Sequence, residues 1–133
     1  MKKKICIVQS IYNEDITSKL LNGAIRELKS KKVKEIKVIK VPGSFEIPQV
    51  ISKLIGKYDG FIAIGCIIKG ETYHFELIAN ETSKKIIDLS INNEVPIGFG
   101  VLACYNLQQA IVRSDINKKN KGREAALACI KLL

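Results

Sequence analysis

The chain has few of the residues on which metal, nucleotide and membrane sites depend. Its 133 residues include one histidine, four cysteines and no tryptophan, and aromatic residues make up 6%. The cysteines form no CxxC pair, which argues against a structural zinc site. No apolar run reaches the roughly 18–20 residues that cross a bilayer. GxGxxG, P-loop, GxSxG and EF-hand patterns are missing too, so the usual apparatus for dinucleotides, ATP and calcium is absent.

The start of the chain predicts a cytoplasmic protein. Three lysines precede a short apolar run that is too brief for an export signal. In a reducing compartment the four cysteines, each within an apolar stretch, are expected to be small buried side chains.

Size and charge favour one globular domain covering residues 1–133. The chain is 47% hydrophobic and 26% charged, which is typical of a folded domain. Its net charge of +9 raises the possibility of nucleic-acid binding. The lysines are spread along the sequence without an RNA-binding aromatic motif, so a solvated basic surface is the simpler interpretation. Affinity that falls steeply with salt would favour the alternative.

Short apolar runs alternate with segments of helical periodicity. The runs predict strands at 4–10, 36–41, 60–68 and 96–103, and the periodic segments predict helices at 17–31, 46–55, 72–92, 107–113 and 122–133. Strands without polar alternation suit a parallel sheet covered on both faces. The expected fold is a flavodoxin-like, three-layer α/β/α sandwich around a four-stranded parallel sheet.

Ligands of such sheets bind beyond the carboxyl ends of the strands, where this sequence has unusual segments. After the first strand, Tyr12 could stack on a flat heterocycle or be a partly buried tyrosine. In VPGSFEIP (41–48), Ser44 is expected to cap a helix and Glu46 to suit its dipole, although the same groups could bind a polyol.

The segment GCIIKGETYHFE (65–76) is the most informative. A strand leads through glycine to a predicted helix N-terminus, which can bind phosphate. His74, expected about one turn inside that helix, could transfer protons at neutral pH or be an ordinary surface or core residue. Later in the chain, Arg113 and the lysines at 118, 119 and 121 could bind phosphate or form a basic surface.

Five motifs together resemble the 6,7-dimethyl-8-ribityllumazine synthases: Tyr12-Asn13, VPGSFEIP, GCIIKGETYHFE, PIGFGVL (96–102), and AIVRS followed by NKGREAA. The resemblance covers nearly the whole chain. It implies a transferase of riboflavin biosynthesis that condenses 5-amino-6-(ribitylamino)uracil with 3,4-dihydroxy-2-butanone 4-phosphate, releasing phosphate and water. It implies no metal or organic cofactor.

The resemblance also implies a role for each matched residue. His74 would transfer protons. The pyrimidine and ribityl groups would contact Tyr12, Ser44, Phe45, Glu46, Cys66, Ile67, Ile68 and, from a neighbouring subunit, Phe99. The phosphate would lie at Glu71, Thr72, Arg113 and Lys121. Because a carboxylate repels phosphate, Glu71 is expected to act through its backbone N–H.

The family pattern implies a pentamer with active sites between subunits, leaving the choice among pentamer, decamer and 60-subunit shell open. The sequence departs from the pattern in having Tyr12 for Phe, Lys69 for Arg, Glu71 for a small residue and Glu76 for Asp, and in a shorter N-terminus. Two alternatives within this fold are a lumazine or flavin carrier without turnover and the dismutating riboflavin synthase of archaea. GETYH resembles the lumazine synthases better.

Overall fold

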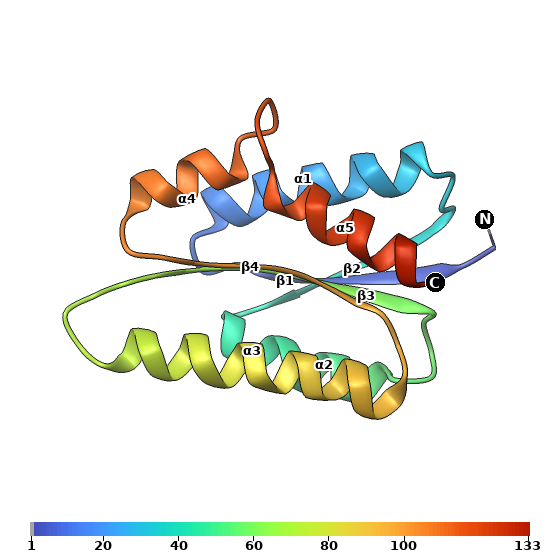
Figure 1. Cartoon of the computed structure of the whole chain (residues 1–133), viewed down its shortest axis with the longest axis horizontal. Helices are drawn as coiled ribbons and strands as arrows, with labels where there is room; N and C mark the ends of the chain where they lie inside the picture. The colour runs from blue at the N-terminus through green and yellow to red at the C-terminus, as the bar shows by residue number, and fades with distance from the viewer. Residues whose placement is uncertain (1) are drawn as a thin grey trace.

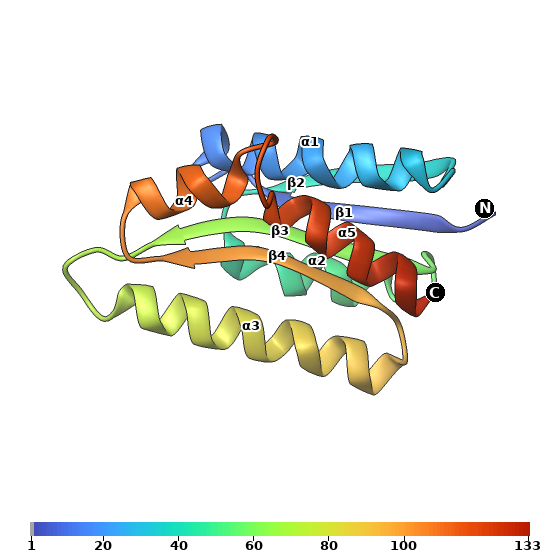
Figure 2. The ribbon, with the colours of Figure 1, turned by 45° about the horizontal axis from the view of Figure 1, so that its top comes forward.

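A computed structural model of the chain describes residues 2–133. Its four strands form one parallel sheet in the order β2-β1-β3-β4 (Figure 2). The strands are β1 (Lys4–Ser10), β2 (Glu35–Val41), β3 (Gly60–Ile68) and β4 (Ile97–Cys104). The predicted parallel sheet is therefore confirmed, and the predicted bounds of β1 and β3 agree with the observed ones.

Helices cover both faces of the sheet (Figure 1). One face carries α1 (Glu14–Ser30), α4 (Leu107–Ser114) and α5 (Lys121–Leu132). The other carries the short 3-10 helix η1 (Ser44–Glu46), α2 (Ile47–Leu54) and α3 (His74–Asn93). The α/β/α sandwich is confirmed, with η1 as an element that the sequence pattern did not predict. None of the helices described between residues 2 and 133 combines the length and apolarity needed to cross a membrane.

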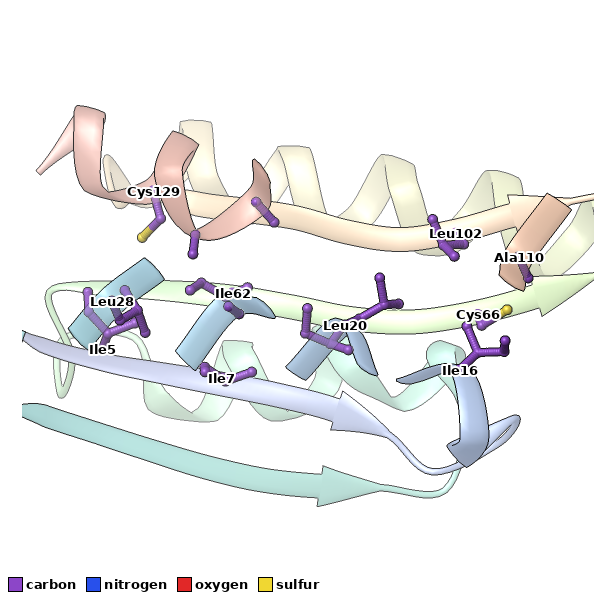
Figure 3. Packing of buried hydrophobic residues seen from close by; sticks show 14 of the residues in the cluster. Ile5, Ile7, Ile16, Leu20, Leu28, Ile62, Cys66, Leu102, Ala110 and Cys129 are labelled. Carbon is purple, nitrogen blue, oxygen red and sulfur yellow. The ribbon is translucent and has the colours of Figure 1, made fainter. Parts of the chain in front are cut away.

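The sheet separates two apolar cores. Side chains alternate along a strand, so Ile5 and Ile7 of β1 face α1 and α5, whereas Cys6 and Val8 face α2. Figure 3 shows the first of these cores, in which Leu20 of α1 packs against the sheet. Burial on both faces explains why β1 and β3 read as continuous apolar runs, whereas the partly exposed edge strand β2 also contains charged residues.

All four cysteines are free and buried, as the sequence predicts. Burial raises the pKa of Cys6 and Cys129 to about 11 and that of Cys66 to about 12, and it raises the pKa of Cys104 as well. The reactive thiolate is therefore scarce at neutral pH, and the cysteines act as small hydrophobic side chains.

Asn120 joins three elements on the α1/α5 face. It is fully buried, and its Nδ2 donates to the carbonyls of Lys19 (3.0 Å) and Ser114 (2.8 Å). Its Oδ1 accepts the N–H of Arg123 at 2.9 Å and so caps α5. One amide thus links α1, the end of α4 and the start of α5.

Replacing Asn120→Ala is expected to lower the free energy of unfolding by about 2–3 kcal/mol, because a helix cap is lost and two carbonyls lose a partner. The matched control is Asn106→Ala, which removes an exposed cap of α4 that accepts only the N–H of Gln109. This control should cost about 1 kcal/mol. Urea unfolding at equal protein concentration measures both variants; equal losses would contradict a joining role for Asn120.

Candidate active site

A cavity of about 520 Å³ lies beside the carboxyl ends of β1, β2 and β3, between η1 and the start of α3. Nine of the thirteen residues singled out from the sequence line it: Tyr12, Ser44, Phe45, Glu46, Cys66, Ile67, Ile68, Thr72 and His74. Gly43, Gly70, Phe75 and Ile78 complete the lining. The fold therefore brings three separate segments of the sequence around one space.

The η1 wall depends on a close approach between η1 and β3. A Cβ atom on Gly65 would clash with Oγ of buried Ser44, so glycine at this position leaves room for the serine in its present conformation. The predicted capping role of Ser44 is wrong, because neither η1 nor α2 has a side-chain cap. Instead, the N–H of Glu46 donates to the carbonyl of Gly43 at 3.2 Å and closes the turn. Ser44 is buried but still lines the cavity, and Phe45 remains half exposed beside it.

His74 stands at the mouth of the cavity as the first residue of α3. The expected position one turn inside the helix is therefore wrong. Thr72 Oγ1 accepts the backbone N–H of His74 at 3.3 Å, and such a side-chain turn competes with helix formation. The delayed start leaves the histidine side chain exposed, within reach of a ligand in the cavity.

Asn13 supports the opposite wall, although sequence reasoning gave it no role of its own. Its backbone is left-handed (φ 59°), and its Nδ2 donates to the carbonyl of Cys66 at 3.0 Å. This bond ties the loop that carries Tyr12 to the end of β3. The tyrosine ring itself is 70% exposed and lines the cavity. Asparagine tolerates this backbone better than most residues, which is the signal that could have indicated a structural role.

Cys66 borders the cavity at the end of β3. Its side chain points away into the core with Leu102 and Ala110 (Figure 3). Together with the raised pKa, this direction excludes the thiol as a nucleophile in the cavity. The neighbouring Ile67 and Ile68 are half-buried and provide apolar surface.

Four of the predicted residues do not line the cavity of their own chain. Phe99 is exposed on β4 and lines a separate hollow beside α3. Arg113 lies on α4, on the other side of the sheet, where Nη1 donates to the Gln109 carbonyl at 3.2 Å. Lys121 pairs with Glu124 at 3.2 Å. Glu71 is exposed and outside the lining.

The cavity suits a flat organic ligand with a hydroxylated side chain. Its apolar surface comes from aromatic and isoleucine side chains, and Ser44, Glu46, Thr72 and His74 supply polar groups. Within residues 2–133, no cluster of three or more His, Cys, Asp or Glu side chains could hold a metal ion.

Comparison with known proteins identifies the family of the chain. The family model for 6,7-dimethyl-8-ribityllumazine synthase matches residues 2–133. The chain belongs to this family. A relative from Kosmotoga olearia, itself called 6,7-dimethyl-8-ribityllumazine synthase, is 42% identical over 133 residues, which cover 97% of this chain and 85% of the relative.

One residue that departs from the lumazine synthase pattern contacts an aromatic ring. Lys69, at the position where arginine is common, places Nζ 5.6 Å from the centre of the Tyr105 ring. The Phe75 ring lies 6.3 Å from the same tyrosine. The backbone N–H of Lys69 also donates to the carbonyl of Cys104 at 2.9 Å. These contacts hold the loop before α3 against the loop after β4.

Proposed function

We propose that the cavity is where the chain condenses 5-amino-6-(ribitylamino)uracil with 3,4-dihydroxy-2-butanone 4-phosphate to 6,7-dimethyl-8-ribityllumazine, with release of phosphate and water. This is a transferase reaction of riboflavin biosynthesis. The observation that carries the assignment is the joint lining of one space of about 520 Å³ by the 43–46 and 66–74 segments, with the only histidine of the chain at its mouth.

The uracil derivative would occupy the part of the cavity between η1 and the end of β3. Tyr12, Ile67 and Ile68 offer surfaces for the pyrimidine ring, and Cys66 borders the same end. Ser44, Phe45 and Glu46 lie where the ribityl chain would extend, and Glu46 can accept hydrogen bonds from its hydroxyls. An orienting site of this kind is worth roughly 7–11 kcal/mol when two substrates must meet.

The phosphorylated substrate would lie towards the start of α3. Thr72 lines the cavity there, and the first N–H groups of a helix favour an anion. The amine attacks the ketone, water leaves to form an imine, phosphate is eliminated, and ring closure releases water. His74 would move the protons in these steps, a role worth about 10²–10⁴-fold in rate. Glu71 would contribute its backbone N–H.

A second copy of the chain would complete the phosphate site. Phe99, Arg113 and Lys121 stand away from their own cavity and would serve a neighbour's, the arginine as a clamp for the leaving phosphate. Exposed apolar side chains support such contacts. They lie on α3 and in and around α4: Leu77, Ile87, Ile91, Tyr105, Leu107, Ile111 and Val112. The proposed assembly is a cytoplasmic homopentamer, or a multiple of it, without nucleic-acid or membrane partners.

The test is to supply both substrates to the purified chain and follow phosphate and lumazine absorbance together. The expected result is their appearance in equal amounts, with neither formed from a single substrate. Binding of the lumazine product or of the uracil derivative without phosphate release would overturn the proposal in favour of a carrier.

A further inference from the structure

A second hollow, at the other end of the sheet, gathers four lysines. It has a volume of about 460 Å³ and lies by the amino ends of β1 and β2, away from the candidate active site. Its lining is Lys4, Lys34, Glu35, Ile36, Lys37, Leu54, Lys57 and Tyr58. In the sequence these lysines are scattered between positions 4 and 57, so only the fold brings them around one space.

Strand register and the short length of α2 create this hollow. Lys4 pairs with Glu35 and Cys6 pairs with Lys37, so these side chains share the α2 face of the sheet. Because α2 ends at Leu54, it leaves this end of the sheet uncovered.

The loop after α2 forms the remaining wall and is held in place by hydrogen bonds. The N–H of Lys57 donates to the carbonyl of Leu54 at 3.0 Å. The N–H of Asp59 donates to the carbonyl of Lys4, and the N–H of Lys4 donates to Asp59 Oδ2, both at 2.8 Å. Lys57 and Tyr58 are therefore fixed beside the start of β1.

Positive charge in the hollow is largely uncompensated. Glu35 is the only carboxylate among the lining residues, and its Oε2 lies 3.9 Å from Nζ of Lys4, with both side chains more than half exposed, so this ion pair is weak. The Asp59 carboxylate beside the hollow accepts the backbone N–H of Lys4. Among residues 2–133, no carboxylate lies within ion-pair distance of Lys34, Lys37 or Lys57. Lysine on an edge strand discourages sheet pairing, which accounts for Lys37 on β2 but not for the two lysines outside the strands.

We propose that this hollow binds a small ligand carrying two or more phosphate groups. Four ammonium groups around one space match a compact polyanion, and lysine acts on phosphate as a mobile point charge. The volume is that of a small-molecule site rather than of a helix groove. Tyr58 and Leu54 add an apolar surface on which an organic part of the ligand can rest. The site is separate from the proposed condensation site, so each can fail alone.

Inorganic tripolyphosphate is the probe, titrated by calorimetry into the assembled protein at low ionic strength. The double variant Lys37→Gln/Lys57→Gln should weaken binding at least about tenfold, whereas Lys37→Arg/Lys57→Arg should retain it. Lys29→Gln/Lys131→Gln is the matched control: it removes the same charge from exposed lysines outside the hollow and should keep the affinity. Lumazine formation should be unchanged in all three variants.

Arg113→Ala separates this site from the proposed phosphate site of the reaction. It should leave tripolyphosphate binding at the lysine hollow intact. The proposal is overturned if tripolyphosphate does not bind, if Arg113→Ala abolishes binding while Lys37→Gln/Lys57→Gln does not, or if the two glutamine pairs weaken it equally. The last result would mean diffuse attraction to a basic surface, as for a nucleic acid.

Discussion

Co-assembly of two inactive variants is expected to restore about a quarter of the wild-type rate of lumazine formation. One variant, Arg113→Ala, lacks the proposed phosphate clamp. The other, Glu46→Gln/His74→Ala, lacks polar groups of the cavity. Each alone should lose at least about 10²-fold in rate.

Recovery is expected because these groups lie on different parts of the chain. Glu46 and His74 line the cavity, whereas Arg113 lies on α4 across the sheet. If each site combines one cavity with the Arg113 face of a neighbour, random mixing of equal amounts gives about one site in four with both faces intact. The two variants are unfolded together, refolded as a mixture and assayed for phosphate and lumazine.

The control is a mixture of the single variants Glu46→Gln and His74→Ala. Both changes fall on the same cavity, so no mixed site regains both groups and the rate should stay low. Recovery in the control, or none in the main mixture despite mixed assembly shown by mass spectrometry, would contradict a shared site.

Gly122→Ala is expected to lower the free energy of unfolding by about 4 kcal/mol or more. Gly122 is the second residue of α5, and alanine has the higher helix propensity, so propensity alone predicts a small gain. Here the added Cβ would lie 1.9 Å from the carbonyl oxygen of Leu20. The Cβ is fixed to the backbone of α5 and the atoms that it meets are backbone atoms of α1, so the clash is relieved only if the two helices move apart.

Gly70→Ala is the matched control for this steric argument. A Cβ on Gly70 meets nothing within 4 Å, and its backbone is not in the left-handed region. Its stability should change by less than about 1 kcal/mol. Thermal and urea unfolding at equal protein concentration measures both variants, since assembly raises apparent stability. A neutral Gly122→Ala variant would show that the two helices can move apart at little cost.

Periodicity was enough to predict the sheet and the number of α-helices. Strands β1 and β3 are buried on both faces, so their apolar runs are unbroken and their limits are clear in the sequence. Strands β2 and β4 are partly exposed, and their limits were predicted to within one residue. The start of α3 was predicted two residues early. The hydroxyl of Thr72 accepts the backbone N–H of His74, and this hydrogen bond delays the start of the helix. Competition between a side-chain hydrogen bond and helix formation leaves no periodic pattern in the sequence. The 3-10 turn at Ser44 was missed because it depends on the space that Gly65 leaves.

The site was predictable to the extent that it follows the strand ends. Tyr12, Ser44 and His74 come after three neighbouring strands and meet at one edge, as parallel topology requires. The grouping of lysines in the second hollow could not be predicted in the same way. Lys4 and Lys57 meet only through strand register and a loop held by Asp59, which involve residues far apart in the sequence.

The contact between α1 and α5 has a consequence for synthesis on the ribosome. The inner surface of α1 packs on a helix that begins 91 positions after α1 ends. At about 5–20 residues per second, the nascent chain would carry that surface uncovered for roughly 5–20 s. Until α5 has been made, the part of α1 that packs on it is available to other proteins, including chaperones. Completion of this layer therefore has to wait for α5, which is made well after α1.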